Sequence, residues 1–293
     1  MRTRLKEVNG IDWGDAAVMN CKWKGVWLKD ILERAEVTLD SGHVAFSCYQ
    51  SRVQGVDWYG GSIELWRAMN GDADVLLALE VTSLLVPPLN TSKSIQMNGK
   101  PLSYNHGYPV RVIVPGVSGC RSVKWLDQIT VQPDESTNLY QRNDYKVLPP
   151  EATDAEAARR YWDVTPALQD MPVNSVVASP EPGETVILSP DGTVEVKGYA
   201  LPQGSDGPVV RVEISTDDGR TWQEAEILAE SEDQSKWCWS LWKAKVRVGK
   251  GQNRRLLSRA TDNGGNMQNA WPEWNLRGVA YDGYGESGGL TVQ

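Results

Sequence analysis

The sequence predicts an α+β domain followed by an all-β sandwich, and three observations favour this organisation. The chain has 293 residues, of which 40% are hydrophobic, and this is enough for two cores at the usual domain size. Helical and strand-like patterns are mixed up to about residue 150, whereas short alternating runs separated by turns follow from about residue 173. We therefore expect a first domain over 1–150, a linker over 151–172 and a second domain over 173–293.

The first part combines short helices with strands. Apolar pairs at helical spacing predict an amphipathic helix over 25–37, and a strand over 43–48 follows it. Ser62 stands where an N-cap is expected, so a second short helix should end at Asn70. Apolar runs predict further strands over 74–80, 108–116 and 128–132.

The linker and the second part have their own signals. Thr153-Asp-Ala-Glu matches a capping box and predicts a helix through Trp162. Asp217-Asp-Gly-Arg-Thr-Trp, between two alternating runs, predicts a hairpin turn. The length of the second part, with its turn-separated strands, favours an immunoglobulin-like sandwich. Its strands are expected over 193–199, 209–215, 237–242 and 254–260.

Charge and composition exclude several classes of function. The net charge of −8 argues against a nucleic-acid partner, because a phosphate backbone recruits basic surfaces. No apolar run approaches the roughly 20 residues that cross a membrane, and the N-terminus shown lacks a secretory pattern. Four dispersed cysteines and two histidines favour neither a disulfide framework nor a multi-histidine metal site. We expect an intracellular, soluble protein.

The strongest physical signal is a basic stretch in an acidic chain. Between Val81 and Leu126 there is no Asp or Glu, and a Gly-rich loop after an apolar strand offers backbone N–H donors. Its cations are Lys93, Lys100, Arg111, Arg121 and Lys124. This combination predicts a local anion site, although an ordinary basic surface loop remains an alternative. By themselves, His106 could be structural and Tyr145 could be exposed.

Taken together, these segments resemble the sulfite oxidase family of molybdopterin enzymes, which includes assimilatory nitrate reductases. The matching stretches occur in one order over nearly the whole chain. They are Met97-Asn-Gly-Lys-Pro-Leu, Asn105-His-Gly-Tyr-Pro-Val-Arg-Val-Ile-Val-Pro-Gly, Gly119-Cys-Arg-Ser-Val-Lys-Trp-Leu, Gln141-Arg-Asn-Asp-Tyr-Lys and Trp274-Asn-Leu-Arg-Gly-Val. The resemblance implies the molybdenum cofactor, sulfite as substrate and a homodimer formed through the second domain.

The resemblance also implies roles for individual residues. Residues of the family that hold the pterin and its phosphate match His106, Arg111, Ser122, Val123 and Lys124. Residues that form the substrate pocket match Trp13, Arg142, Tyr145 and Arg277. Nitrate reductases carry Asn at the position of Tyr145, so sulfite oxidation is the favoured reaction. Electrons would then pass to oxygen or to a separate cytochrome, since no haem domain is seen.

The sequence departs from the family pattern in three places, one of which is that the family's pterin-contacting Asp has no clear counterpart around Gln50-Ser51. The family's molybdenum ligand is a Cys in a Cys-Ala-Gly-Asn-Arg-Arg motif upstream of the Trp13 position. This chain begins after that motif, and Cys21 does not occupy the ligand position, so we expect no metal ligand and impaired turnover. Residues 81–96 interrupt a continuous family segment, and their ends fit a retained in-frame intron.

Three functions therefore remain open. The favoured one is a sulfite-oxidising molybdenum enzyme. A non-catalytic or incorrectly spliced fragment that only dimerises is the first alternative, and a nitrate reductase-like enzyme is the second. The compartment is expected to be mitochondrial or cytoplasmic.

Overall fold

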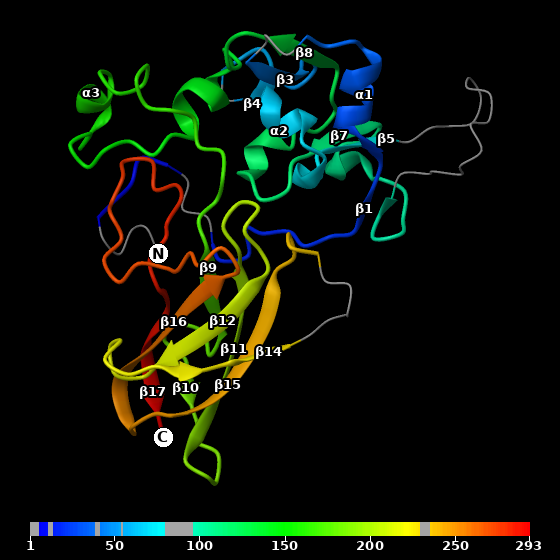
Figure 1. The fold of residues 1–293 in the computed structure, drawn as a ribbon. Helices are drawn as coiled ribbons and strands as arrows, with labels where there is room; N and C mark the ends of the chain where they lie inside the picture. The colour runs from blue at the N-terminus through cyan, green and yellow to red at the C-terminus, as the bar shows by residue number, and fades with distance from the viewer. Residues whose placement is uncertain (1–5, 11–13, 39–41, 54, 80–95, 229–234) are drawn as a thin grey trace. The chain divides into compact units, whose positions relative to one another are not determined.

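A computed structural model describes residues 6–10, 14–38, 42–53, 55–79, 96–228 and 235–293 of the chain (Figure 1). The chain folds into two compact units. Unit 1 contains Met1–Val18, Asp170–Trp274 and Ala280–Gln293, and unit 2 contains Met19–Gln169 and Asn275–Val279. Trp13 and the proposed intron, apart from Gln96, lie outside the described residues.

The described residues of unit 2 form three small antiparallel sheets. The first pairs β1 (Trp23–Lys24) with β6 (Gln96–Met97), and the second has the order β2-β5-β7, with strands Val26–Trp27, Leu76–Leu79 and Val110–Ile113. The third has the order β4-β3-β8, with strands Tyr59–Glu64, His43–Cys48 and Gln128–Gln132. The buried core includes Val44, Phe46, Ile63 and Val112 from these strands. The strands predicted over 43–48 and 128–132 are confirmed.

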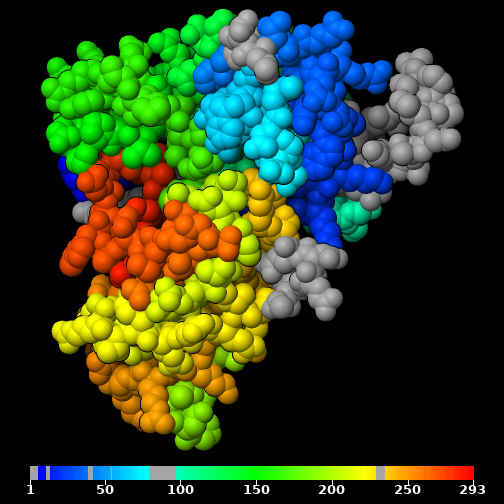
Figure 2. Space-filling view, in the orientation of Figure 1, coloured from blue at the N-terminus to red at the C-terminus, as the bar shows by residue number. Residues whose placement is uncertain are grey.

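Two helices pack against this core. Leu28 and Leu32 of α1 (Leu28–Arg34) are both buried, because residues four apart lie on one helix face. Figure 2 shows the blue and cyan segments that contain α1 and α2 (Leu65–Met69) side by side. The helix predicted over 25–37 is shorter than expected. Val26 and Trp27, just before α1, pair with β5 instead of joining the helix. Gly25 lies so close to this strand that a Cβ atom on it would be 2.1 Å from the Leu77 carbonyl oxygen.

The predicted helix cap at Ser62 is wrong. Ser62 is fully buried within β4, where it pairs with Ala45 of β3. Its hydroxyl oxygen accepts a hydrogen bond from the Ser136 backbone N–H at 2.8 Å. The helix therefore begins at Leu65, and Glu64 occupies the N-cap without a side-chain hydrogen bond. Strand pairing outcompetes the local capping preference of a serine.

Short helical turns complete the described part of unit 2. They are η2 (Gly71–Ala73), η3 (Tyr104–His106), η4 (Gly119–Arg121) and the π-helix η5 (Tyr140–Asp144). The helix predicted through Trp162 is only α3 (Ala155–Ala158). Asp154, rather than Thr153, is its N-cap, because the Asp154 carboxylate accepts from the backbone N–H groups of Glu156 and Ala157. None of the helices in the described segments has the length and apolar composition to span a membrane.

The described strands of unit 1 form two sheets that share one core. One sheet has the order β10-β17-β16-β12-β13, with strands Thr185–Val186, Gly285–Val292, Gly251–Asp262, Val209–Ser215 and Gln223–Glu224. The other has the order β14-β15-β11-β9, with strands Glu226–Leu228, Ser240–Arg247, Thr193–Leu201 and Asn174–Ser179. The predicted sandwich strands are confirmed, except that β15 begins at Ser240 rather than Trp237. Val196 and Trp242 from one sheet and Ile214 and Leu256 from the other are buried together.

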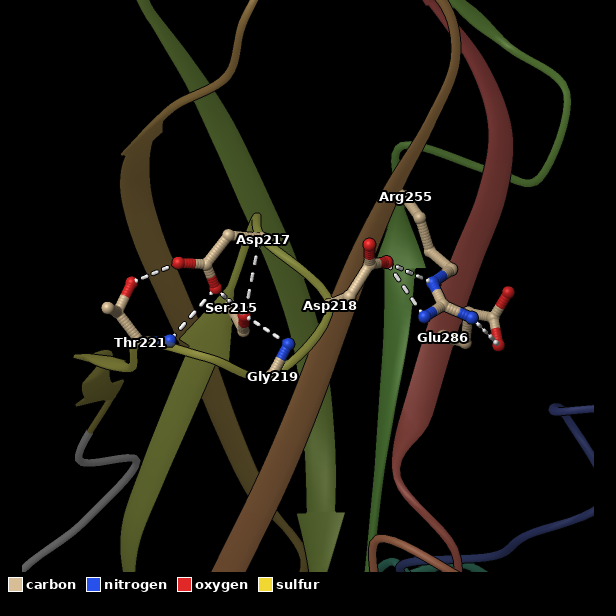
Figure 3. A network of polar contacts seen from close by, with 7 residues as sticks. All are labelled: Ser215, Asp217, Asp218, Gly219, Thr221, Arg255 and Glu286. Atoms are coloured by element: carbon tan, nitrogen blue, oxygen red, sulfur yellow. Dashed lines mark hydrogen bonds and ion pairs between the residues drawn. The ribbon is translucent and has the colours of Figure 1, made fainter.

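The predicted turn between β12 and β13 is confirmed (Figure 3). Asp218 and Gly219 have positive φ angles of 63° and 82°. The Asp217 carboxylate accepts hydrogen bonds from the hydroxyls of Ser215 and Thr221 at 2.8 and 2.6 Å. A short carboxylate side chain thus replaces the solvent that the turn's polar groups would otherwise need.

Candidate active site

Arg111 on β7 is a buried cation within the basic stretch between Val81 and Leu126. Its side chain is 6% exposed, and its guanidinium lies 5.0 Å from the ring centroid of Trp23. Two N–H groups donate to the carbonyl oxygens of His106 and Ser122 at 2.9 and 3.2 Å. The Nε–H is buried and has no hydrogen-bond acceptor among the described residues. Arg111 therefore ties η3 to the loop after η4 while keeping one unused donor.

Lys124 supplies a second cation beside Arg111. Its Nζ donates to the Asn105 carbonyl oxygen at 3.0 Å and lies 4.5 Å from the ring centroid of Trp125. Burial lowers the pKa of Lys124, and the charge of Arg111 lowers it further. Burial likewise lowers the pKa of Arg111 to about 10. Arg111 thus remains protonated at neutral pH, and its positive charge acts on the Lys124 ammonium group beside it.

The remaining predicted cofactor residues lie around these cations in different ways. The Ser122 hydroxyl accepts from the Val114 backbone N–H at 3.0 Å, and the Val123 carbonyl accepts from Val112 at the same distance. The Val123 side chain is fully buried in the core. His106 is exposed, and its Nδ1 lies 2.6 Å from the Ser103 hydroxyl. The carbonyl oxygens of His106 and Val123 accept hydrogen bonds from Arg111 and Val112, so both residues help to fix the shape of the loop.

A pocket of about 190 Å³ opens between these residues. It is lined by Cys48, Ser51, Tyr59, Arg111, Gly119, Ser122, Lys124 and Trp125. None of the lining residues is acidic. Two cations, a serine hydroxyl and a glycine backbone therefore face one space, and this donor set suits a phosphate group. Three of the five predicted cofactor residues line the pocket, whereas His106 and Val123 do not.

Tyr145 follows directly after the π-helix η5. Its carbonyl oxygen accepts from the Leu168 backbone N–H at 2.8 Å. Burial raises the pKa of Tyr145 to about 12, and the charges of Cys120 and Asp144 act in the same direction. Arg121 opposes this increase. The phenol therefore stays protonated over the neutral range and can donate a hydrogen bond.

Arg277 is brought to the same place by Asp144. Its Nη2 donates to the Asp144 carboxylate at 2.5 Å and its Nε donates to the Asp144 carbonyl at 3.3 Å. Both side chains are largely buried, at 20% and 24% exposed. Arg142 is not part of this cluster, because its 54% exposed side chain forms an ion pair with Asp163 at 3.0 Å. Arg277 thus pairs with Asp144, the residue that directly precedes Tyr145.

Several residues at the site were not predicted from the sequence. Tyr59 lines the pocket, and its hydroxyl donates to the Cys120 carbonyl at 2.8 Å. Burial raises its pKa above the usual range. Because Tyr59 is far from the loop in sequence, no local pattern indicates this contact. Asp144 and Gly119, by contrast, lie inside motifs that the sequence singles out.

Comparisons with known proteins match both halves of the chain. The family model of the oxidoreductase molybdopterin-binding domain matches residues 1–90 and 94–140. The model of the Mo-co oxidoreductase dimerisation domain matches residues 165–285. The sulfite oxidase of Arabidopsis thaliana is 35% identical, over 94% of this chain and 69% of the plant protein. The chain belongs to the sulfite oxidase family.

Other members of the sulfite oxidase family are similar over comparable lengths. Human mitochondrial sulfite oxidase is 41% identical over 94% of this chain and 48% of its own length. The chain thus spans about half of that relative. The NADH nitrate reductase of Volvox carteri is 33% identical, over 96% of this chain and 32% of the algal protein.

A solved structure shows the same fold. The sulfane dehydrogenase SoxCD from Paracoccus pantotrophus superposes with a TM-score of 0.64 at 21% identity, over 90% of this chain and 59% of the other. As a member of the sulfite oxidase family, the chain has a molybdopterin-binding domain followed by a mostly β dimerisation domain. Within the described residues, no cluster of three or more His, Cys, Asp or Glu side chains could hold a metal ion.

Proposed function

We propose that this chain carries the cofactor and substrate residues of a sulfite-oxidising molybdenum enzyme. The observation that supports the proposal most strongly is the acid-free pocket, with the buried, partly unsatisfied guanidinium of Arg111 on its wall. A buried N–H without an acceptor is costly unless a ligand satisfies it. Arg111, Ser122 and Lys124 fit the phosphate of molybdopterin, with His106 and Val123 supporting the loop. When bound, the molybdenum cofactor supplies an oxygen atom to the substrate and accepts two electrons.

Tyr145 and Arg277 are the proposed substrate residues. Sulfite is a compact anion with three oxygens, so a guanidinium and a protonated phenol are suitable partners. Oxidation of sulfite to sulfate takes up one oxygen atom, replaced from water over the full cycle, and releases two protons and two electrons; the electrons pass to oxygen or to a separate cytochrome. Asp144 holds Arg277 and adds negative charge beside the Tyr145 phenol. We include Trp13 and Arg142 in the proposed substrate site; Arg142 would have to leave Asp163 to reach an anion.

The test compares cofactor content and turnover in matched variants. The protein is expressed from its natural gene in a host that makes the molybdenum cofactor. Molybdenum content and sulfite-dependent cytochrome reduction are then measured. We expect Arg111→Met to lose both, because it removes the phosphate's buried donor. Arg52→Met, at a side chain that is 85% exposed, serves as the control and should retain both.

Two outcomes would contradict the proposal. A cofactor-loaded protein that reduces nitrate and leaves sulfite unoxidised would favour the nitrate reductase-like alternative, which the Volvox carteri similarity supports. A protein that dimerises but purifies without molybdenum or pterin would favour the non-catalytic alternative.

A further inference from the structure

Arg121 is a fully buried cation without a carboxylate partner among the described residues. Its side chain is 0% exposed, and its two hydrogen bonds go to main-chain carbonyl oxygens. Its Nε–H is also buried and has no acceptor within the described part of the chain. A buried charge is normally paired, because its desolvation is expensive. The position of Arg121 therefore needs an explanation beyond packing.

The two carbonyl acceptors lie on the two segments that hold Tyr145. Nη1 donates to the carbonyl oxygen of Tyr140 at 3.0 Å, at the start of the π-helix that ends immediately before Tyr145. Nη2 donates to the carbonyl oxygen of Leu168 at 3.1 Å. The Leu168 N–H in turn donates to the Tyr145 carbonyl oxygen. A single guanidinium thus bridges both supports of Tyr145.

Arg121 itself belongs to the cofactor side of the site. It ends η4 and directly precedes Ser122, which lines the pocket. β4 packs closely against it, since a Cβ atom on Gly61 would lie 3.3 Å from both Cδ and Nη1 of Arg121. The strand also anchors the π-helix, because the Ser62 N–H donates to the Gln141 side chain at 3.0 Å. The guanidinium has little room to move.

We propose that Arg121 is a positioning residue that fixes Tyr145 relative to the pocket holding the cofactor phosphate. The inference rests on the proposed function, because Tyr145 matters for turnover only if it contacts the substrate. The planar fork of arginine donates along two directions at once, whereas lysine offers a single compact charge. The uncompensated charge also favours an anion in the neighbouring site.

The surroundings of Arg121 agree with an electrostatic effect on the same group. Its charge acts to lower the pKa values of Tyr59, Cys120, Tyr145 and Lys146. Asp144 acts on Tyr145 in the opposite direction, and burial dominates both. Removing the guanidinium should therefore change both the place and the acidity of the Tyr145 phenol.

The first experiment needs no turnover. The protein is labelled with 3-fluorotyrosine, and Tyr145→Phe identifies the Tyr145 signal in ¹⁹F NMR spectra. We expect Arg121→Lys to shift that signal by loss of the two-carbonyl bridge. Arg121→Met should also raise the pKa of the phenol further. Arg67→Met removes another buried arginine of unit 2, at 5% exposure, and should leave the Tyr145 signal in place.

The second experiment separates positioning from the proposed chemistry. In cofactor-loaded protein, Arg121→Lys should lower kcat for sulfite on the order of 10²-fold, as expected for a displacement of about 1 Å, with little change in KM. Arg121→Met should also raise KM, because the positive charge is lost. If the Arg121 variants shift the Tyr145 signal but the wild-type protein does not oxidise sulfite, the positioning role stands and the proposed function is rejected.

One result would overturn the positioning role. This is a Tyr145 signal with unchanged shift and titration in folded Arg121 variants. If both variants fail to fold, Gly61→Ala provides the test, because its methyl group must displace the guanidinium by a few tenths of an ångström. It should then give a smaller shift of the same signal, and no shift would reject the proposal.

Discussion

At the residue scale, Tyr145 is a phenol held in its neutral form. Burial is the main cause of its raised pKa, and the nearby acidic groups Cys120, Asp144 and Tyr140 add to it. A neutral phenol can donate to an oxyanion, whereas a phenolate would repel it. The same environment that protects the phenol thus makes it suitable for the proposed substrate.

The raised pKa predicts a change of stability with pH. Between the ordinary value of 10.0 and the folded value of about 12, the folded protein holds the Tyr145 proton that the unfolded chain releases. The free energy of unfolding should therefore fall as the pH rises through this interval. Tyr145→Phe removes this contribution. Urea unfolding at several pH values should show a shallower alkaline decline for Tyr145→Phe than for the wild type.

The control for this prediction is Tyr104→Phe, because Tyr104 is 71% exposed. Its alkaline decline should match that of the wild type. Parallel curves for the wild type and Tyr145→Phe would show that the phenol gains no proton affinity on folding.

Residue-scale contacts were only partly predictable. The absence of acidic residues between Val81 and Leu126 indicated that Arg111 and Lys124 share an anion site, and the structure places both on one pocket. The pairing of Arg277 with Asp144 could not be predicted from local patterns, because it depends on the return of 275–279 to unit 2. The contact of the Tyr59 hydroxyl with the Cys120 carbonyl was also not predictable, because Tyr59 lies on β4, far from Cys120 in the sequence.

At the scale of elements, the turn after β12 is a self-contained polar structure. The Asp217 carboxylate accepts from the backbone N–H and the hydroxyl of Thr221, and Ser215 donates to it as well. These hydrogen bonds lower the pKa of Asp217 to about 2, with the Thr221 hydroxyl as the largest cause. Figure 3 shows that Asp218 points the other way, to Arg255 on β16.

Asp217→Asn should therefore destabilise the folded chain in a pH-dependent way. A carboxyl group with a lowered pKa contributes stability above its ordinary value of 3.8, and this stability is lost as the pH falls toward 2. The variant should have a lower urea midpoint at pH 7, and the difference from the wild type should close in acid. Asp218→Asn is the matched control, because it makes the same chemical change one residue along the turn. A gap of constant size at all pH values would contradict the prediction.

Element boundaries show where local signals are insufficient. Turn chemistry predicted the Asp217 hairpin because all of its partners lie within a few residues. Ser62 and Thr153 carried equally good cap signals but do not cap helices. The Ser62 signal lost to pairing with β3, and Asp154 provides the competing carboxylate one residue after Thr153. Such competition is decided by tertiary structure.

At the scale of the whole molecule, the change of sequence pattern near residue 173 predicted two domains. The two-sheet core of unit 1 agrees with the strands predicted for the second domain. The assignment of Asn275–Val279 to unit 2 could not be predicted, because five residues are too few to show a periodic pattern. We propose that the boundary between the molybdopterin-binding and dimerisation domains lies in the 151–172 linker. The dimerisation-domain match from 165 is compatible with this assignment.

The dimerisation domain predicts that the chain forms a homodimer through unit 1. Large apolar side chains are exposed there, with Trp271 at 91% and Ile187 at 78%. A tryptophan buried at an interface commonly contributes about 2 kcal/mol or more, or roughly 30-fold in Kd. Light scattering of the full chain should give twice its 32.5 kDa mass. Trp271→Ser should weaken the dimer by that factor, whereas Trp66→Ser in unit 2 should not. A monomer at micromolar concentration would contradict the homodimer. A dimer weakened only by Trp66→Ser would place the interface on unit 2.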